Sequence, residues 1–500
     1  MTGRAARRIV GGALAFAAAC SVARGDTLVE AAQRADLAAV RALVAAGADA
    51  DARDVDGATP LLYAAHVGNV EVVRALLAAG ADPNATNRYG VAPLHEASQV
   101  ADAALIGALL DAGAEVERAL PEGETPLMLA SRTSALAAVQ LLIDRGANVN
   151  VVERWQGQTP LMYAAAHDRG PVAAALIAAG ADVNAKTPRN ELPARLPAAR
   201  FNVEFPLGGM TPVLLAARQG SVNALRVLIE AGADLDVRTP EGFSALVVAL
   251  HNLKYDAAKL LIDAGASPSG GALYTIVNAR NRVPLIGPRP VPTGTVTELE
   301  LLAAMLARGA DVLDRPPLPL PDRDPGFGAI PTRPVDTALI RAARSADIES
   351  LRLLIEAGAD PKLREPDGFN AVLAVTAGPE IPPLVVVDRE RPAEPDAVAA
   401  LTFLLDNGVD VTAADAFFGA TALHTAAKRG YPEVVRLLAA RGADLNAADR
   451  GGNTPLDYAL GRSPAMFGAP PQSPAAAAVL RELGAREGTP VRPAAATAAR

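Results

Sequence analysis

The stretch TALHTAAKRG, residues 421–430, contains the residue types that most resemble a reactive site. Its His424 is one of only five histidines in the chain and is followed closely by Lys428 and Arg429. A histidine beside two cations could act as a general base next to an anion-binding pocket. The same residues could instead belong to one helix that buries the histidine and exposes the cations at its C-terminal end. The rest of the sequence has to distinguish these two interpretations.

Other candidate groups do not complete a known catalytic or metal-binding motif. His95-Glu96 begins like the zinc-binding helix H-E-x-x-H, but Gln99 stands where the second histidine ligand belongs. The aspartates of residues 49–56 lack the spacing and the closing glutamate of a calcium loop. The sequence also contains no phosphate loop, nucleophile elbow or dinucleotide fingerprint. It therefore predicts no catalytic residue, no metal site and no cofactor.

A repeat dominates the sequence instead. Its marker is a glycine followed by a small residue and usually an acid or amide, found at Gly47, Gly80, Gly113, Gly146, Gly180, Gly232, Gly265, Gly309, Gly358, Gly408, Gly442 and Gly484. Six of the eleven steps between these glycines are 33 or 34 residues, and the other five are longer. Insertions into a repeat lengthen a step and never shorten it, so the chain is predicted to be one array of about twelve units.

The unit at residues 58–90 predicts two helices followed by a turn. Thr59 can cap the start of the first helix, and Gly68 can end it in a left-handed conformation. Asn69 begins a second helix, whose apolar residues recur at helical spacing until Gly80. A helix pair of this size cannot bury its apolar face alone, so the units are expected to stack into an all-α repeat solenoid.

Several copies of this unit resemble a known family. TPLLYAAHVGNVEVVRALLAAGADPN, APLHEAS, TPLMYAAAHDRGPVAAALIAAGADVN and TALHTAAKRGYPEVVRLLAARGADLN resemble ankyrin repeats in their helix start, second helix and G-A-D-x-N turn, over roughly residues 26–488. The resemblance implies helix–turn–helix units with β-hairpin fingers, and a concave groove that binds protein partners. His95 and His424 occupy the fourth position of its T-P-L-H element, where a structural role is expected.

The resemblance also implies which residues face the groove, namely those just after the Ala-Ala pair of the first helix. Cations recur at these positions and include Arg132, Arg218, Arg344, Lys428 and Arg429. They could simply complement the helix dipole while solvated. Alternatively, they form a basic stripe that selects an acidic segment of a partner.

Aromatic residues lie beside the glycine that precedes a new unit. They are Tyr89, Trp155, Phe243, Phe369 and Phe418, and Trp155 is the only tryptophan. Interface hot spots favour tryptophan and tyrosine. Tyr89 and Trp155 are therefore predicted to bind a partner, whereas the phenylalanines can also simply cover the stack.

The charge balance argues against nucleic acid as that partner. The chain has a net charge of -8, and without the arginines of its first 25 residues it would have 43 Lys+Arg against 55 Asp+Glu, or -12. Nonspecific nucleic-acid binding needs a basic face that neutralises phosphates.

Residues 1–25 have the layout of a secretory signal. Three arginines precede an apolar run of about 11 residues from Ile9, which is too short to span a bilayer, and Ala23-Arg24-Gly25 forms a small-x-small cleavage site. Cys20 is the sole cysteine, so cleavage after Gly25 would leave a thiol-free chain. The run before Cys20 also resembles a weak bacterial lipoprotein box, so lipidation at Cys20 and no cleavage remain alternatives. The protein is expected to be periplasmic or secreted, and to contact a membrane only if it is lipidated.

Four proline-rich segments interrupt the period, at residues 186–208, 282–295, 314–335 and 379–395. Proline excludes helix continuation, so these segments are expected to be loops at the solenoid edge. They are either tolerated surface loops, or the three later ones project together as part of a binding surface. They also allow a division into two domains near residues 270–335, and residues 489–500 are expected to be a disordered tail.

The sequence thus favours an exported, noncatalytic protein-binding scaffold. An exported enzyme or small-ligand receptor, with a site in the groove or under the proline-rich loops, is the alternative. The repeats leave no unassigned span longer than about 25 residues, far below the size of a catalytic domain.

Overall fold

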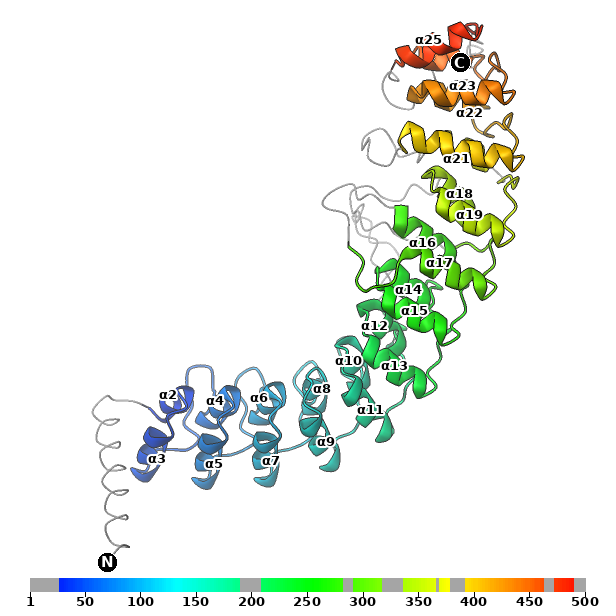
Figure 1. Ribbon diagram of the computed structural model, residues 1–500. Coiled ribbons are helices and arrows are strands. Elements are labelled where there is room, and N and C mark those ends of the chain that lie inside the picture. Colours follow the sequence, from blue (N-terminus) through cyan, green and yellow to red (C-terminus); the bar gives the residue numbers. More distant parts are fainter. Residues whose placement is uncertain are drawn as a thin grey trace, which may run out of the picture. The chain divides into compact units, whose positions relative to one another are not determined.

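The computed structural model describes residues 27–188, 208–281, 291–316, 336–365, 368–377, 392–462 and 472–489. The predicted signal segment with Cys20, most of each insertion and nearly all of the predicted tail lie outside these ranges. The described residues form 24 helices arranged as twelve consecutive pairs (Figure 1). The prediction of an all-α repeat solenoid of about twelve units is confirmed.

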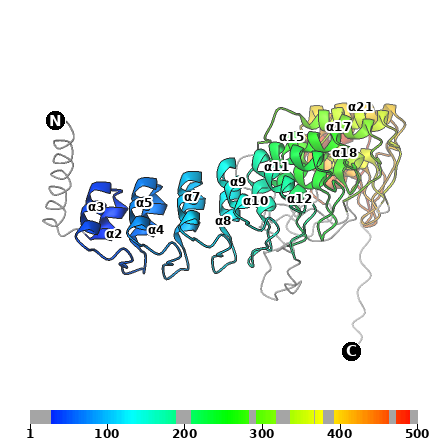
Figure 2. The ribbon, with the colours of Figure 1, turned by 90° about the horizontal axis from the view of Figure 1, so that it is seen from below.

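The described chain divides into two compact units. The first ends at Pro240 and holds six helix pairs. Their helices are α2 (Leu28–Gln33), α3 (Leu37–Ala45), α4 (Pro60–Val67), α5 (Val70–Ala78), α6 (Pro93–Val100), α7 (Ala103–Asp111), α8 (Pro126–Ser131), α9 (Leu136–Asp144), α10 (Pro160–Ala166), α11 (Gly170–Ala178), α12 (Pro212–Gln219) and α13 (Val222–Glu230). The first helices pack in one row and the second helices in another (Figure 2).

The second unit begins at Glu241 and repeats this arrangement. Its helices are α14 (Ala245–His251), α15 (Tyr255–Asp263), α16 (Ala272–Asn281), α17 (Glu298–Ala307), α18 (Ala338–Arg344), α19 (Ile348–Glu356), α20 (Ala371–Ala377), α21 (Glu394–Asp406), α22 (Ala422–Arg429), α23 (Pro432–Ala440), α24 (Pro455–Ala459) and α25 (Pro474–Glu482). The division between the units lies at Pro240–Glu241, outside the region 270–335 suggested by proline content.

Helix boundaries follow from local side-chain chemistry. The hydroxyl of Thr59 accepts the N–H of Leu62 at 3.3 Å, and α4 ends where Gly68 adopts a φ of 78°. The side chain of Asn69 then caps α5. The boundaries predicted for this repeat are confirmed.

The core between stacked repeats is made of small and branched apolar side chains. Ala64 and Ala65 of α4 are completely buried, and so are Val72, Val73 and Leu76 of α5. Alanine lets the first helices of neighbouring repeats approach closely, while the larger residues fill the space between the rows. This packing explains why the chain needs few aromatic residues.

The fingers between helix pairs differ from the β-hairpins that the family resemblance implied. Among the described residues there are no extended strands, and isolated bridge residues take their place: Ala414 pairs with Thr421, Lys254 pairs with Thr293, and Arg238 and Ser244 are bridge residues on either side of another finger. A finger is closed instead by short bonds such as Gly57 N–H to Asp54 carbonyl at 3.0 Å, with Gly57 at a φ of 75°. The turn is too short for a ladder to extend along it.

The five long interruptions of the array occur at two different places. Residues 189–207 and 317–335 connect a second helix to the next first helix, on the finger side of a pair. Residues 282–290, 378–391 and 463–471 connect the two helices within a pair, which is the opposite end. The described residues that flank the three later proline-rich segments therefore do not all lie at the same end of the helix pairs, and most of each segment lies outside the described residues.

The described ends of these segments also correct the predicted loop limits. α21 begins at Glu394, two residues inside the segment expected to be loop. Thr293 donates its N–H to the Leu253 carbonyl at 3.0 Å, and Thr295 donates to Asp256 at 3.0 Å. Residues 291–295 are thus tied to the preceding repeat rather than protruding.

Two second helices are capped by the neighbouring repeat. The N–H of Ala224, in the first turn of α13, donates to the Asp168 carboxylate at 3.0 Å. The N–H of Val434, in the first turn of α23, donates to the Glu394 carboxylate at 3.2 Å. Neither helix has a cap bond from its own N-cap side chain. The start of each of these helices therefore depends on a residue one repeat earlier.

Candidate partner-binding surface

Trp155 lies at the tip of the finger between α9 and α10, and 75% of it is exposed. The finger backbone around it is held by Glu153, which is itself only 2% exposed. The Glu153 carboxylate accepts the N–H groups of Trp155, Gln156 and Gln158, the last at 2.8 Å. A large apolar side chain is thereby presented to solvent on a fixed backbone.

Tyr89 occupies the tip of an earlier finger and is 57% exposed. The side chain of Asn87 accepts the N–H groups of Tyr89 and Val91, both at 3.0 Å. The Arg88 guanidinium donates to the Tyr89 hydroxyl at 2.6 Å and lies 4.8 Å from the ring centroid. Tyr89 and Trp155 thus have the exposure that the sequence prediction requires of them.

Each of these fingers is held by one polar side chain that the sequence analysis did not single out. Asp54, Asn87, Glu153, Asp415 and Asp449 occupy equivalent positions, three or four residues before the finger glycine. Each accepts N–H groups of its own finger through its side chain. Aligning the repeats on their finger glycines would have revealed this position, because it is an acid or amide in all five.

The phenylalanines beside the finger glycines behave differently. Phe243 is 6% exposed and Phe369 is 2% exposed, so both cover the stack. Phe418 is half-buried and packs edge-on against Phe417, which is exposed. This contrast separates the finger aromatics into buried packing residues and exposed anchors.

The predicted basic stripe is not uniform. In the first unit Arg218 is exposed and has no ion-pair partner among the described residues. Arg132 is half-buried, lies 3.7 Å from the Glu124 carboxylate and sits 5.4 Å from the Tyr163 ring centroid. Arg218 is therefore exposed, although partial burial of its guanidinium lowers its pKa, whereas the charge of Arg132 is shared with its neighbours.

Arg344 requires a correction, since it is buried instead of facing a partner. Its side chain is 8% exposed, and its Nε donates to the Asp336 carboxylate at 2.6 Å. The guanidinium also lies 5.1 Å from the ring centroid of Phe369. Arg344 thus binds Asp336, just before the start of α18, and does not present its charge to a partner.

Lys428 and Arg429, the cations of the opening stretch, are both half-buried. Arg429 donates to the Ala377 carbonyl at 2.8 Å, at the last residue of α20. The Lys428 carbonyl accepts the hydroxyl of Ser473 at 3.2 Å. These two positions thus connect α22 to the repeats on either side, in addition to any surface role.

His95 and His424 are completely buried and complete the starts of α6 and α22. Each Nδ1 accepts a backbone N–H, from Ala92 at 2.9 Å and from Thr421 at 3.1 Å. Each Nε2 faces a carbonyl oxygen of the next finger, at 2.8 Å and 3.1 Å. A ring that accepts at Nδ1 and donates at Nε2 is neutral, so the expected structural role of both histidines is confirmed.

This arrangement predicts a pH dependence of stability. Burial lowers the pKa of both His95 and His424 from the ordinary value of 6.5. As the pH falls below 6.5, the two histidines become protonated in the unfolded chain but stay neutral in the folded chain. The free energy of unfolding should therefore decrease until the pH reaches the lowered pKa of the folded state. Urea unfolding at pH 7.5, 6.0 and 5.0 should show this loss in the native chain.

A matched pair of variants checks the origin of that loss. His95→Gln combined with His424→Gln should flatten the stability profile between pH 6.5 and 5.0. His167→Gln, at an exposed histidine, should leave the profile as it is in the native chain. Equal slopes in all three proteins would contradict the assignment.

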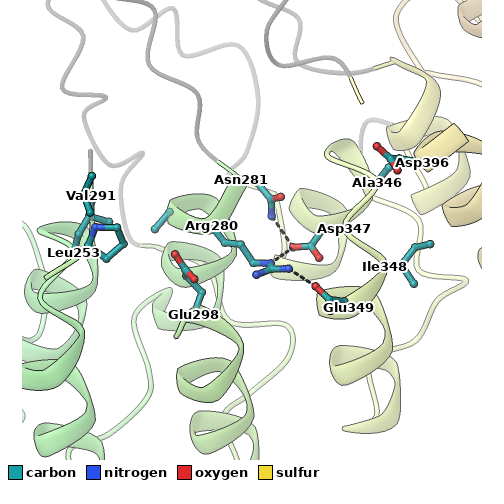
Figure 3. A pocket seen from close by; sticks show the side chains of 12 residues that line it. Leu253, Arg280, Asn281, Val291, Glu298, Ala346, Asp347, Ile348, Glu349 and Asp396 are labelled. Atoms are coloured by element: carbon teal, nitrogen blue, oxygen red, sulfur yellow. Dashed lines mark hydrogen bonds and ion pairs between the residues drawn. The ribbon is translucent and has the colours of Figure 1, made fainter. Parts of the chain in front are cut away.

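A cavity of about 680 Å³ lies in the second unit (Figure 3). Its wall includes the apolar residues Leu253, Val291 and Ile348, and the carboxylates of Glu298 and Asp396. This cavity was not predicted from the sequence. Its walls come from irregular repeats, where Arg280 meets Asp347 and Glu349, nearly 70 positions later in the chain.

A bridge of charged residues crosses the cavity wall. Arg280 donates through Nε to Asp347 at 3.1 Å and through its terminal nitrogen to Glu349. Asn281 donates to the same Asp347 carboxylate at 2.8 Å. The bridge ties the end of α16 to the α18–α19 turn.

The described ranges contain no group of three or more His, Cys, Asp or Glu residues that could hold a metal ion. None of their helices has the length and apolarity needed to cross a bilayer.

The repeats match known proteins over much of the chain. A family model described as ankyrin repeats (3 copies) matches residues 28–119, 94–187 and 196–270. A second, described as ankyrin repeats (many copies), matches residues 404–459. Together the matched ranges cover more than half of the chain.

Solved structures with similarity to the chain are ankyrin repeat domains. One is that of human ASB11, with 27% identity over 47% of this chain and 97% of that chain and a TM-score of 0.40. Another is that of Bcl-3, a unique member of the IkappaB protein family, with 29% identity over 47% and 99% and a TM-score of 0.38. Ankyrin repeats are generally protein–protein interaction modules. On the matches of both family models, this chain belongs to the ankyrin repeat family.

Proposed function

We propose that this protein is a noncatalytic scaffold that binds a protein partner through its finger tips and the groove of its first unit. The observation that carries the proposal is the exposure of Trp155 on a finger fixed by buried Glu153. Binding a rigid aromatic anchor costs little conformational entropy, and tryptophan is enriched at the energetic centre of interfaces. Tyr89 extends the same kind of surface to an earlier finger.

Arg218 is the cation best placed to bind an acidic segment of the partner. The residue is exposed at the C-terminal end of α12, and a carboxylate of the partner would offset the partial burial that lowers the pKa of its guanidinium. Arg132, Arg344 and Arg429 all have contacts within the protein. A partner's acidic residue would therefore add to the aromatic anchors rather than replace them.

The test is affinity capture with the immobilised full chain. The partner should be retained by the native protein and by Phe417→Ala, which removes an equally exposed aromatic from the second unit. Trp155→Ala with Tyr89→Ala should weaken the interaction about thirtyfold or more, because each hot spot contributes roughly 1 to 2 kcal/mol or more. Undiminished capture by the double variant would refute the assignment of these anchors.

Export is part of the proposed role. The support is the residue pattern of positions 1–25, with cleavage after Gly25 or lipidation at Cys20 as the two routes. The proposed location is the periplasm or the medium, or the cell envelope if the chain is lipidated. The mass of the mature N-terminus distinguishes cleavage, lipidation and an intact chain.

A further inference from the structure

We propose that the cavity of the second unit binds a basic peptide segment of a partner protein. The inference rests on the proposed scaffold function and assigns a partner chemistry to a surface separate from Trp155. The occupant follows from the charge, shape and rigidity of the lining.

The charge of the lining favours a cation. Among the described residues, four carboxylates line the cavity, against the one guanidinium of Arg280. Arg280 is already paired with Asp347 and Glu349. Glu298 and Asp396 have no ion-pair partner among the described residues, and they lie on opposite sides of the Arg280 bridge in Figure 3. A concave site with excess charge of one sign concentrates its field on a ligand of the opposite sign.

The apolar part of the lining selects a cation that has an aliphatic stem. Leu253 and Ile348 contribute hydrocarbon surface, and Val291 is 82% exposed at the rim. Lysine and arginine side chains pack their methylene stems on apolar surface while the charged group remains at a polar one. A bare metal ion could not use this wall.

The size of the cavity favours a peptide over a single small cation. Its volume of about 680 Å³ falls in the range of roughly 300–1,000 Å³ found for ligand sites. Glu298 and Asp396 lie on opposite sides of the bridge without an ion-pair partner among the described residues, so an extended segment that carries basic residues at two positions can pair with both.

The wall is also formed before a ligand arrives. Asp347 has a side chain only 4% exposed, accepts from Arg280 and Asn281, and caps α19 through the N–H of Ser350 at 3.2 Å. A site held by its own hydrogen bonds need not be ordered by the peptide, which lowers the cost of binding.

The experiment is a fluorescence anisotropy titration of the full chain with a labelled peptide of four Leu-Arg repeats. The native protein should bind it, and a peptide of four Leu-Glu repeats should not compete. Glu298→Gln with Asp396→Asn should weaken binding about fivefold or more, because each exposed charge pair contributes roughly twofold to fivefold. Glu298→Gln keeps an acceptor for the Tyr255 hydroxyl, now 3.3 Å away, so the fold should be retained.

The matched control is Glu356→Gln with Glu433→Gln, which removes two exposed carboxylates of the second unit outside the cavity. Equal weakening by both double variants would overturn the inference, since general acidity would then explain binding. Displacement of the Leu-Arg peptide by an equal concentration of spermidine would also overturn it, in favour of a free polyamine. Because the probe is synthetic, failure here leaves Trp155-dependent partner capture untouched, and failure of that capture leaves this titration untouched.

Discussion

Arg344→Glu is expected to destabilise the second unit by about 3 to 5 kcal/mol, the usual consequence of leaving a buried charge without its partner. The guanidinium of Arg344 is 8% exposed and donates to both oxygens of Asp336, at 2.6 and 3.3 Å. A glutamate would place a second carboxylate against Asp336 in a site with little access to water. The midpoint of urea unfolding, followed by circular dichroism, measures the loss.

Arg218→Glu is the matched control for this change. Arg218 occupies the corresponding end of a first helix in the first unit but is exposed, so the free energy of unfolding should change by no more than about 0.5 kcal/mol. If Arg344→Glu left stability unchanged and abolished partner capture instead, Arg344 would belong to a binding surface after all. A charge-reversal test of the groove should accordingly use Arg218.

Glu153→Gln is expected to cost about 2 kcal/mol and to loosen the Trp155 finger. Both carboxylate oxygens accept backbone N–H groups, at 2.9 and 2.8 Å for one oxygen and 3.0 Å for the other. An amide has only one acceptor oxygen, so the replacement turns an NH₂ group toward N–H donors and leaves a buried donor unsatisfied. Partner affinity should fall along with finger rigidity.

The single tryptophan makes this prediction directly measurable. Time-resolved fluorescence anisotropy of Trp155 should show faster local motion in Glu153→Gln than in the native chain. Glu122→Gln, at an exposed carboxylate of the preceding finger, should leave both stability and anisotropy unchanged. Unchanged anisotropy in Glu153→Gln would show that the carboxylate does not fix the anchor.

The regular repeats could be predicted from sequence because each boundary depends on adjacent residues. Thr59, Gly68 and Asn69 act on helices that start or end beside them, so their types suffice. The family resemblance likewise placed His95 and His424 correctly, since the T-P-L-H element is local. The finger strands were expected from the family alone, and the described fingers contain single bridges at most.

Side-chain pairing explains what the sequence could not provide. Arg344 looked like any other cation after an Ala-Ala pair, and its burial depends on its ion pair with Asp336, which the repeat pattern does not specify. The cavity depends on Arg280 meeting Asp347 and Glu349 of the next repeat. No periodicity connects these positions, because the intervening segment is an insertion.

The caps supplied from one repeat to the next limit where this protein can be divided. A fragment that began after Asp168 would contain α13 but lack the carboxylate that receives the Ala224 N–H. A fragment that began after Glu394 would deprive α23 in the same way. Dissection into autonomous pieces should therefore keep each donor repeat with its recipient, even where the helix pairs themselves suggest a clean boundary.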